Sequence, residues 1–139
     1  MTYKYSICYP EKENIEYRNT PLSGSEVIQI AENYPWIDKL NLIRSLKEKD
    51  VYFNPALDFT CIEKGTSFCL TANFDKNQAL EFSLWYTRPK KVKVLFGLLG
   101  EKEKMVVDDI WSISFNKSLK YLEHFIKGDD LLIEELYKK

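Results

Sequence analysis

The sequence predicts an α+β fold, with helices packed on one face of an antiparallel β-meander of about four to six strands. Between residues 57 and 111, short segments alternate apolar with polar residues and are separated by turn residues, as expected for half-buried strands. Apolar residues also recur at helical spacing on both sides of this region, over about residues 25–46 and 115–137. A sheet with one apolar face has to bury that face against a single layer of other elements, and the predicted helices can form this layer.

The first strand is predicted at the N-terminus. Aromatic and apolar residues at positions 3, 5, 7 and 9 alternate with polar ones, and Pro10 ends the pattern. We expect this strand to join the same sheet or to cover its end. A weaker strand follows over residues 15–18, before Pro21 and Gly24 mark a break.

Two helices are predicted before the meander. Ser23 and Glu26 have the spacing of a capping box, which predicts a helix over about residues 25–33. Pro35 suits the first turn of a second helix. Apolar residues of this helix recur at helical spacing, at Trp36, Leu40, Ile43 and Leu46. The charged residues 47–50 end it, and the short segment 51–55 is strand-like.

The meander can be given a register. Lys64 and Gly65 predict a two-residue hairpin turn, which pairs Leu57 with Ala72, Phe59 with Leu70, and Cys61 with Phe68. The polar residues 75–79 close the next hairpin, which pairs Phe74 with Leu80, Ala72 with Phe82, Leu70 with Leu84, and Phe68 with Tyr86. A turn over residues 87–91, around Pro89, would then pair Tyr86 with Val92, Leu84 with Val94, Phe82 with Phe96, and Leu80 with Leu98. A last strand is predicted over about residues 105–111.

Two helices are predicted after the meander. Ser114 or Asn116 can cap the first of them, and Gly128 ends it. Its apolar stripe consists of Phe115, Leu119, Leu122 and Ile126. A last short helix over about residues 129–137 has acidic residues at its start and lysines at its end, as the helix dipole favours.

The composition favours a single domain over residues 1–139 that buries a core without disulfides or metals. The 20 basic and 21 acidic residues nearly cancel, so no basic field favours nucleic acid as a partner. Cys61 and Cys69 point to opposite faces of their hairpin, and the odd number of cysteines predicts reduced thiols in a cytoplasmic protein. Because neither a leader pattern nor an apolar run of about 18 residues is apparent, no membrane association is expected.

The sequence contains no motif for catalysis. Its one histidine, His124, falls outside the apolar stripe of its helix and is predicted to lie in solvent. No ligand spacing indicates a metal, and no phosphate or dinucleotide loop indicates a cofactor. Asp108 and Asp109 are the one carboxylate pair of interest, but neighbours on a strand point to opposite faces. Asp109 is either a buried carboxylate of raised pKa or, as we favour, a residue that reaches water or an amide at a bulge or strand end.

The polar face of the meander carries the candidate binding residues. Two cross-strand rows are predicted on it, one of Thr60, Cys69, Trp85 and Lys93 and one of Thr71, Ser83, Leu95 and Asp108. A tryptophan is out of place there, and tryptophan and arginine are enriched at binding hot spots. The candidate partner-binding set is Trp85, Arg88, Lys90, Lys91 and Lys93. In the alternative interpretation, the N-terminal segment or the Lys93 stem covers Trp85, and the basic run is a solvated turn.

Three strings of the sequence resemble small uncharacterised bacterial α+β proteins. They are Tyr34-Pro35-Trp36-Ile37, Tyr52-Phe53-Asn54-Pro55-Ala56-Leu57-Asp58-Phe59, and Glu81-Phe82-Ser83-Leu84-Trp85-Tyr86-Thr87-Arg88-Pro89-Lys90. Some of these bacterial proteins resemble immunity proteins, which neutralise secreted toxins. The strings contain no catalytic motif, so the resemblance implies a compact cytoplasmic binder and assigns no site residues.

The function predicted from these observations is a non-catalytic protein-binding module, one form of which is an immunity-type inhibitor of a bacterial toxin. The alternative is a small-ligand-binding or enzymatic α+β domain with a pocket between sheet and helices, lined by tyrosines and by Asp109. A third option is self-association through the same polar face. A deep cavity with convergent polar groups would favour the pocket, and a filled core with an open Trp85 face would favour the binder.

Overall fold

The computed structural model describes residues 1–93, 97–98 and 100–138, and these form one six-stranded sheet and four α-helices. The strands are β1 (Tyr3–Cys8), β2 (Glu16–Leu22), β3 (Ala56–Cys61), β4 (Ser67–Phe74), β5 (Leu80–Lys93) and β6 (Glu101–Ile113). The helices are α1 (Gly24–Asn33), α2 (Trp36–Ser45), α3 (Phe115–Lys127) and α4 (Asp130–Tyr137), with a short 3₁₀ helix over Glu48–Asp50. The sheet order is β2-β1-β3-β4-β5-β6 with antiparallel neighbours throughout. The predicted α+β class is confirmed.

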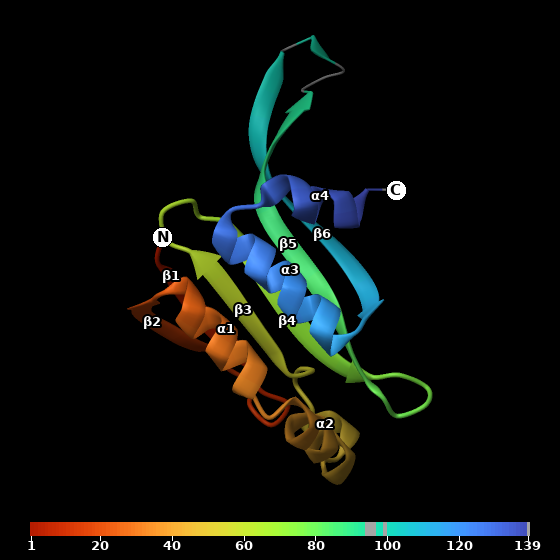
Figure 1. Ribbon diagram of the computed structural model, residues 1–139. Helices are drawn as coiled ribbons and strands as arrows, with labels where there is room; N and C mark the ends of the chain where they lie inside the picture. Colours follow the sequence, from red (N-terminus) through yellow and green to blue (C-terminus); the bar gives the residue numbers. More distant parts are fainter. Residues whose placement is uncertain (94–96, 99, 139) are drawn as a thin grey trace.

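The helices of the described residues pack on one face of the sheet. Figure 1 shows α1 and α3 lying across this face, with α4 near β5 and β6 and with α2 at one end. Aromatic rings join the two layers. Phe125 of α3 stacks on Phe68 of β4 with 5.7 Å between ring centroids, and Trp36 of α2 meets Phe82 of β5 edge-on at 5.0 Å. The opposite face, which we call the open face, has no helix over it among the residues described.

Local signals place the helices as predicted. Ser23 and Glu26 form both hydrogen bonds of the capping box at the start of α1. Ser114 accepts from the Lys117 backbone N–H and caps α3. Gly128 ends α3 in the left-handed region at φ +74°, which glycine adopts without steric cost. Residues 51–55 are not a strand, so that interpretation is wrong, and Pro55 has no N–H to donate to a ladder.

The N-terminal strand joins the sheet. This was one of the two predicted placements, the other being a cover over the end of the sheet. β1 lies between β2 and β3, and its Tyr3 pairs with Cys61 of β3. β2 is longer than predicted and runs through Pro21. Because β2 is an edge strand, it has an unpaired side on which the missing N–H of a proline costs no hydrogen bond.

The two hairpins of the central strands differ in how well their register was predicted. Pairing between β4 and β5 is as expected, with Phe74 opposite Leu80. Between β3 and β4 the predicted register is wrong by two residues, because Phe59 lies opposite Phe68. The connection is wider than a two-residue turn, since the Cys61 N–H donates to the Thr66 carbonyl. A two-residue slip keeps every side chain on its predicted face, whereas a one-residue slip would exchange the faces.

The turn predicted over residues 87–91 is wrong. β5 continues through Pro89, which lies opposite Met105 of β6, and ends at Lys93. β4 begins at Ser67, opposite Thr87. The side of β5 that faces β4 is therefore unpaired beyond Thr87, and a proline there costs no ladder hydrogen bond. The predicted pairing of Tyr86 with Val92 is therefore replaced by pairing with β6. The predicted partners at positions 94 and 96 lie outside the described residues.

A β-bulge interrupts the pairing of β5 with β6. Leu84 lies opposite Ile110 and Phe82 opposite Ile113, so β6 carries one more residue than β5 over this stretch. Ser112 has a positive φ of 62° in the bulge. The extra residue returns Ile113 to the core, where it is buried.

Arg88 links the end of the sheet to the last helix. Its side chain is 5% exposed, and its guanidinium donates to both carboxylate oxygens of Glu134 in α4, at 2.6 and 2.9 Å. The same guanidinium lies 2.6 Å from the Asp108 carboxylate and donates to the Tyr86 carbonyl at 3.2 Å. These bonds lower the pKa of the Glu134 carboxyl. Arg88 therefore holds α4 against β5 and β6.

Replacing Arg88 should destabilise the fold. Arg88→Ala leaves Glu134 and Asp108 without their shared cation and is expected to lower the free energy of unfolding by about 3 kcal/mol. Lys91→Ala is the matched control, because Lys91 is an exposed basic residue of the same strand, and a change below about 0.5 kcal/mol is expected there. Urea unfolding measures both, and equal effects of the two substitutions would contradict this role of Arg88.

Candidate functional site

An apolar patch lies on the open face where β5 pairs with β6. Strand parity places Trp85 and Pro89 of β5 on the open face, together with their partners Asp109 and Met105 of β6. We call Trp85, Met105, Val107 and Trp111 the tryptophan patch. Three of its members are exposed to solvent, Met105 by 49%, Val107 by 55% and Trp111 by 55%. Apolar side chains gathered on an uncovered face are typical of an interaction surface.

The two tryptophans hold each other in place. Their ring centroids are 5.9 Å apart, and the rings meet at 73°, a favourable edge-to-face geometry. The Trp85 indole N–H donates to Ser83 Oγ at 3.0 Å, and the Trp111 indole N–H donates to Asp109 Oδ2 at 2.6 Å. Since both indole N–H groups have acceptors, the rings present apolar surface without an unsatisfied donor.

Trp111 is the neighbour of Trp85 that the sequence analysis missed. The predicted covers were the N-terminal segment and the Lys93 stem, but β1 is three strands away and Lys93 lies at the far end of β5. Trp111 follows Asp109 by two positions, so strand parity alone puts both on one face. The two-residue spacing of Asp109 and Trp111 would have predicted this contact if the sequence had also indicated that Asp109 lies opposite Trp85.

The structure divides the predicted binding residues between the two faces. Trp85, Lys91 and Lys93 lie on the open face, where Lys91 pairs with Glu103 and Lys93 with Glu101. Arg88 and Lys90 point to the helix side, and Lys90 Nζ lies 3.4 Å from Glu134. The five residues therefore do not form one surface, because β5 stays extended where a turn was predicted.

The two adjacent aspartates lie on opposite faces, as expected for neighbours on a strand. Asp109 is exposed on the open face and accepts from Trp111. Asp108 lies on the helix side beside Arg88, so the predicted polar row that joined it to Thr71 and Ser83 is wrong. The other predicted member of that row, Leu95, lies outside the described residues.

Asp58 is a second feature of the open face that the sequence analysis did not single out. It lies on the central strand β3 between Ser6 of β1 and Cys69 of β4. Its Oδ1 atom is buried and has no hydrogen-bond partner among the residues described. Burial raises the pKa of this carboxyl to about 6. A half-buried carboxylate without a partner costs folding free energy unless something outside the chain pairs with it.

The remaining reactive side chains form no centre. Cys8, Cys61 and Cys69 are free thiols, with Cys61 on the helix side and Cys69 on the open face as predicted, and burial raises the pKa of Cys69. His124 is half-buried rather than fully solvated, with Nδ1 3.3 Å from Asp129. Within the described ranges, no three His, Cys, Asp or Glu side chains meet as metal ligands. No helix in that part of the chain is long and apolar enough to cross a membrane.

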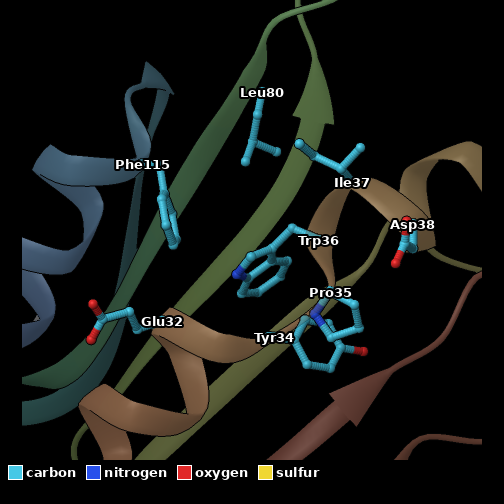
Figure 2. Close-up of a pocket in the computed structure, with 8 residues that line it drawn as sticks. All are labelled: Glu32, Tyr34, Pro35, Trp36, Ile37, Asp38, Leu80 and Phe115. Carbon is cyan, nitrogen blue, oxygen red and sulfur yellow. The ribbon is translucent and has the colours of Figure 1, made fainter.

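One of the pockets on the helix side is apolar. It has a volume of about 300 Å³ and lies between α1, α2, the start of β5 and the start of α3. Figure 2 shows Trp36 at its centre, with Phe115, Leu80 and Ile37 around it and with Glu32 and Asp38 on opposite sides. The Trp36 indole N–H already donates to the Ala31 carbonyl. Polar groups do not converge in this pocket as a specific ligand site requires, and Asp109 is not part of it.

The chain matches no protein-family model, no curated protein and no solved structure. The resemblance to immunity proteins therefore stays a prediction that rests on the three strings of the sequence. What the protein does has to be inferred from its own surfaces.

Asp58 should make stability depend on pH. Its folded-state pKa of about 6 exceeds the ordinary value of 3.8, so stability falls as the pH rises through this interval. Asp58→Asn is expected to raise the free energy of unfolding by about 2 kcal/mol near pH 8 and to change it little near pH 4. Urea unfolding at the two pH values measures this.

Asp109→Asn is the matched control for this prediction, because Asp109 is exposed on the same face. A change below about 0.5 kcal/mol is expected at both pH values. Loss of stability in Asp58→Asn near pH 8 would show instead that the carboxylate has a favourable partner within the folded chain.

Proposed function

We propose that this protein is a non-catalytic protein-binding module that docks its partner on the open face, through the tryptophan patch. The observation that carries the proposal is the exposure of Met105, Val107 and Trp111 beside Trp85 on a sheet face without helices. Tryptophan is one of the residue types enriched at the hot spots of protein interfaces, which cluster near the centre of the buried surface.

The surroundings of the patch support a protein partner. Lys91, Lys93, Glu101 and Glu103 form opposite-charge cross-strand pairs beside it, and a polar rim around an apolar centre is the usual anatomy of an interface. The nearly balanced total charge does not favour nucleic acid. The patch also lies on paired strands rather than on a loop, so a partner would meet a surface that is already ordered.

The specific form of this proposal is an inhibitor of the immunity type, which binds a bacterial toxin in the cytoplasm. The sequence resemblance supports it, and the three free thiols fit a reducing compartment. Binding to a second copy of this chain is the competing use of the same face. Light scattering separates the two, because self-association predicts a dimer that Trp85→Glu dissociates.

Truncation of Trp111 should remove most of the binding energy. With a partner captured from the native host, Trp111→Ala is expected to weaken the affinity at least about 30-fold, or about 2 kcal/mol. Trp85→Ala should have a comparable effect, because each ring supports the other. Calorimetry with the purified partner measures the dissociation constants.

Ile37→Ala is the matched control for this experiment. Ile37 is an exposed apolar residue of similar accessibility, at 52%, but it borders the pocket on the helix side. Unchanged affinity is expected for this variant. If Ile37→Ala weakens binding and Trp111→Ala does not, the partner docks at the helix-side pocket and the proposed interface is wrong.

A further inference from the structure

A polar pocket lies on the open face away from the tryptophan patch, over β2, β1 and β3. Its volume is about 260 Å³, and the side chains that line it include Lys4, Ser6, Tyr17, Asn19, Asp58 and Thr60. Ser6 lies opposite Tyr17 on one side and opposite Asp58 on the other, so it forms the middle of the floor. The pocket is thus built by one face of three paired strands.

Asp58 is the acidic residue of this pocket, and its carboxylate lacks a partner. Oδ1 is buried without a hydrogen bond. The neighbouring strands β1 and β4 both pair with β3, so the backbone N–H groups around Asp58 are engaged in the sheet ladders. Within the described residues, no lysine or arginine nitrogen lies within 4.0 Å of this carboxylate. Among the described residues, the Asp58 carboxylate therefore has no ion-pair partner and its Oδ1 atom has no hydrogen bond.

We propose that this pocket binds a single ammonium or guanidinium group, with Asp58 as its counter-ion. A charged donor makes the strongest hydrogen bonds to a carboxylate. It would meet the part of the Asp58 carboxylate that lines the pocket, since Oδ1 itself is closed to solvent, and its charge offsets the cost of burying the carboxylate. The oxygens of Ser6, Asn19 and Thr60 can accept the remaining N–H groups, and the Tyr17 ring can make a cation–π contact. Lys4 at the rim disfavours a second positive charge, so the ligand is a monocation or carries an anionic group on that side.

This site goes beyond the proposed function, because a small cation can occupy it without any protein on the tryptophan patch. The group can belong to a free amine or guanidine, or to a lysine or arginine side chain of a peptide. Butylammonium and methylguanidinium probe the free group. Acetyl-Gly-Lys-Gly-amide and acetyl-Gly-Arg-Gly-amide probe the same groups on a chain.

The test follows the Asp58 carboxyl by ¹³C NMR during titration with each probe. We expect a saturable shift with a dissociation constant in the millimolar range and a fall of the Asp58 pKa by about one unit or more at saturation. Backbone amide shifts of Ser6 and Thr60, which line the pocket, follow binding in the variants, because Asp58→Asn has no carboxyl to observe. Asp58→Asn should weaken binding at least about tenfold, and Asp109→Asn should bind as the original chain does. Binding of the free cations alone indicates a small-molecule ligand. Binding of the peptides as well indicates that the ligand is a lysine or arginine side chain of a peptide. Either result supports the proposal.

Three results would overturn the proposal. One is the absence of a saturable shift up to about 50 mM of every probe, which is weaker than a specific ion-pair site allows. Another is equal binding to Asp58→Asn, which the pH experiment expects to be stably folded. The third is a rise of the Asp58 pKa by more than about one unit in Lys4→Met, because Lys4 would then already be its partner in solution.

Discussion

The described helices cover one face of the sheet, and the strands β1, β3, β4 and the first half of β5 present an apolar row to that face. Side chains alternate along a strand, so the other row of each strand goes to the open face. Phe68 and Phe82 meet rings of α3 and α2 on the covered side, while Cys69 and Ser83, one position further along each strand, point the other way. Strand parity thus decides which residues build the core and which lie on the open face.

The β5–β6 hairpin continues beyond Thr87, where β5 no longer pairs with β4. Its side chains also alternate between the helix side and the open face. Only one neighbour pairs with each strand there, and β6 leaves a long edge open to other chains. Alternating charges over residues 101–104 and the bulge at Ser112 discourage edge-to-edge pairing. The edge of this hairpin is therefore protected against pairing, while its open face carries the exposed apolar residues Met105, Val107 and Trp111. Arg88 and Glu134 anchor α4 at the base of the hairpin.

For β3, β4 and the first half of β5, the sequence correctly predicted which face of the sheet a side chain lies on, because this depends on alternation along a strand. It did not predict where β5 ends. The pairing of Phe74 with Leu80 was predicted correctly, and the slip that put Phe59 opposite Phe68 left both on the core side. Pro89 was interpreted as a turn residue, because a proline signals a turn and an edge strand equally well. This one error placed Arg88 in a turn instead of on the helix side of β5, and it put Lys93 opposite Trp85 where the structure has Asp109.

Periodicity along the chain specifies the class of fold, the two faces of the sheet, and the capped ends of the helices at Ser23, Ser114 and Gly128, since these depend on residues close in sequence. Pairing between distant segments sets the rest. Trp111 contacts Trp85 because β6 pairs with β5 in the register that sets Asp109 opposite Trp85. Asp58 Oδ1 is shielded from water because strands on both sides flank it. Burial is a property of neighbours, and the neighbours of these residues come from far along the chain.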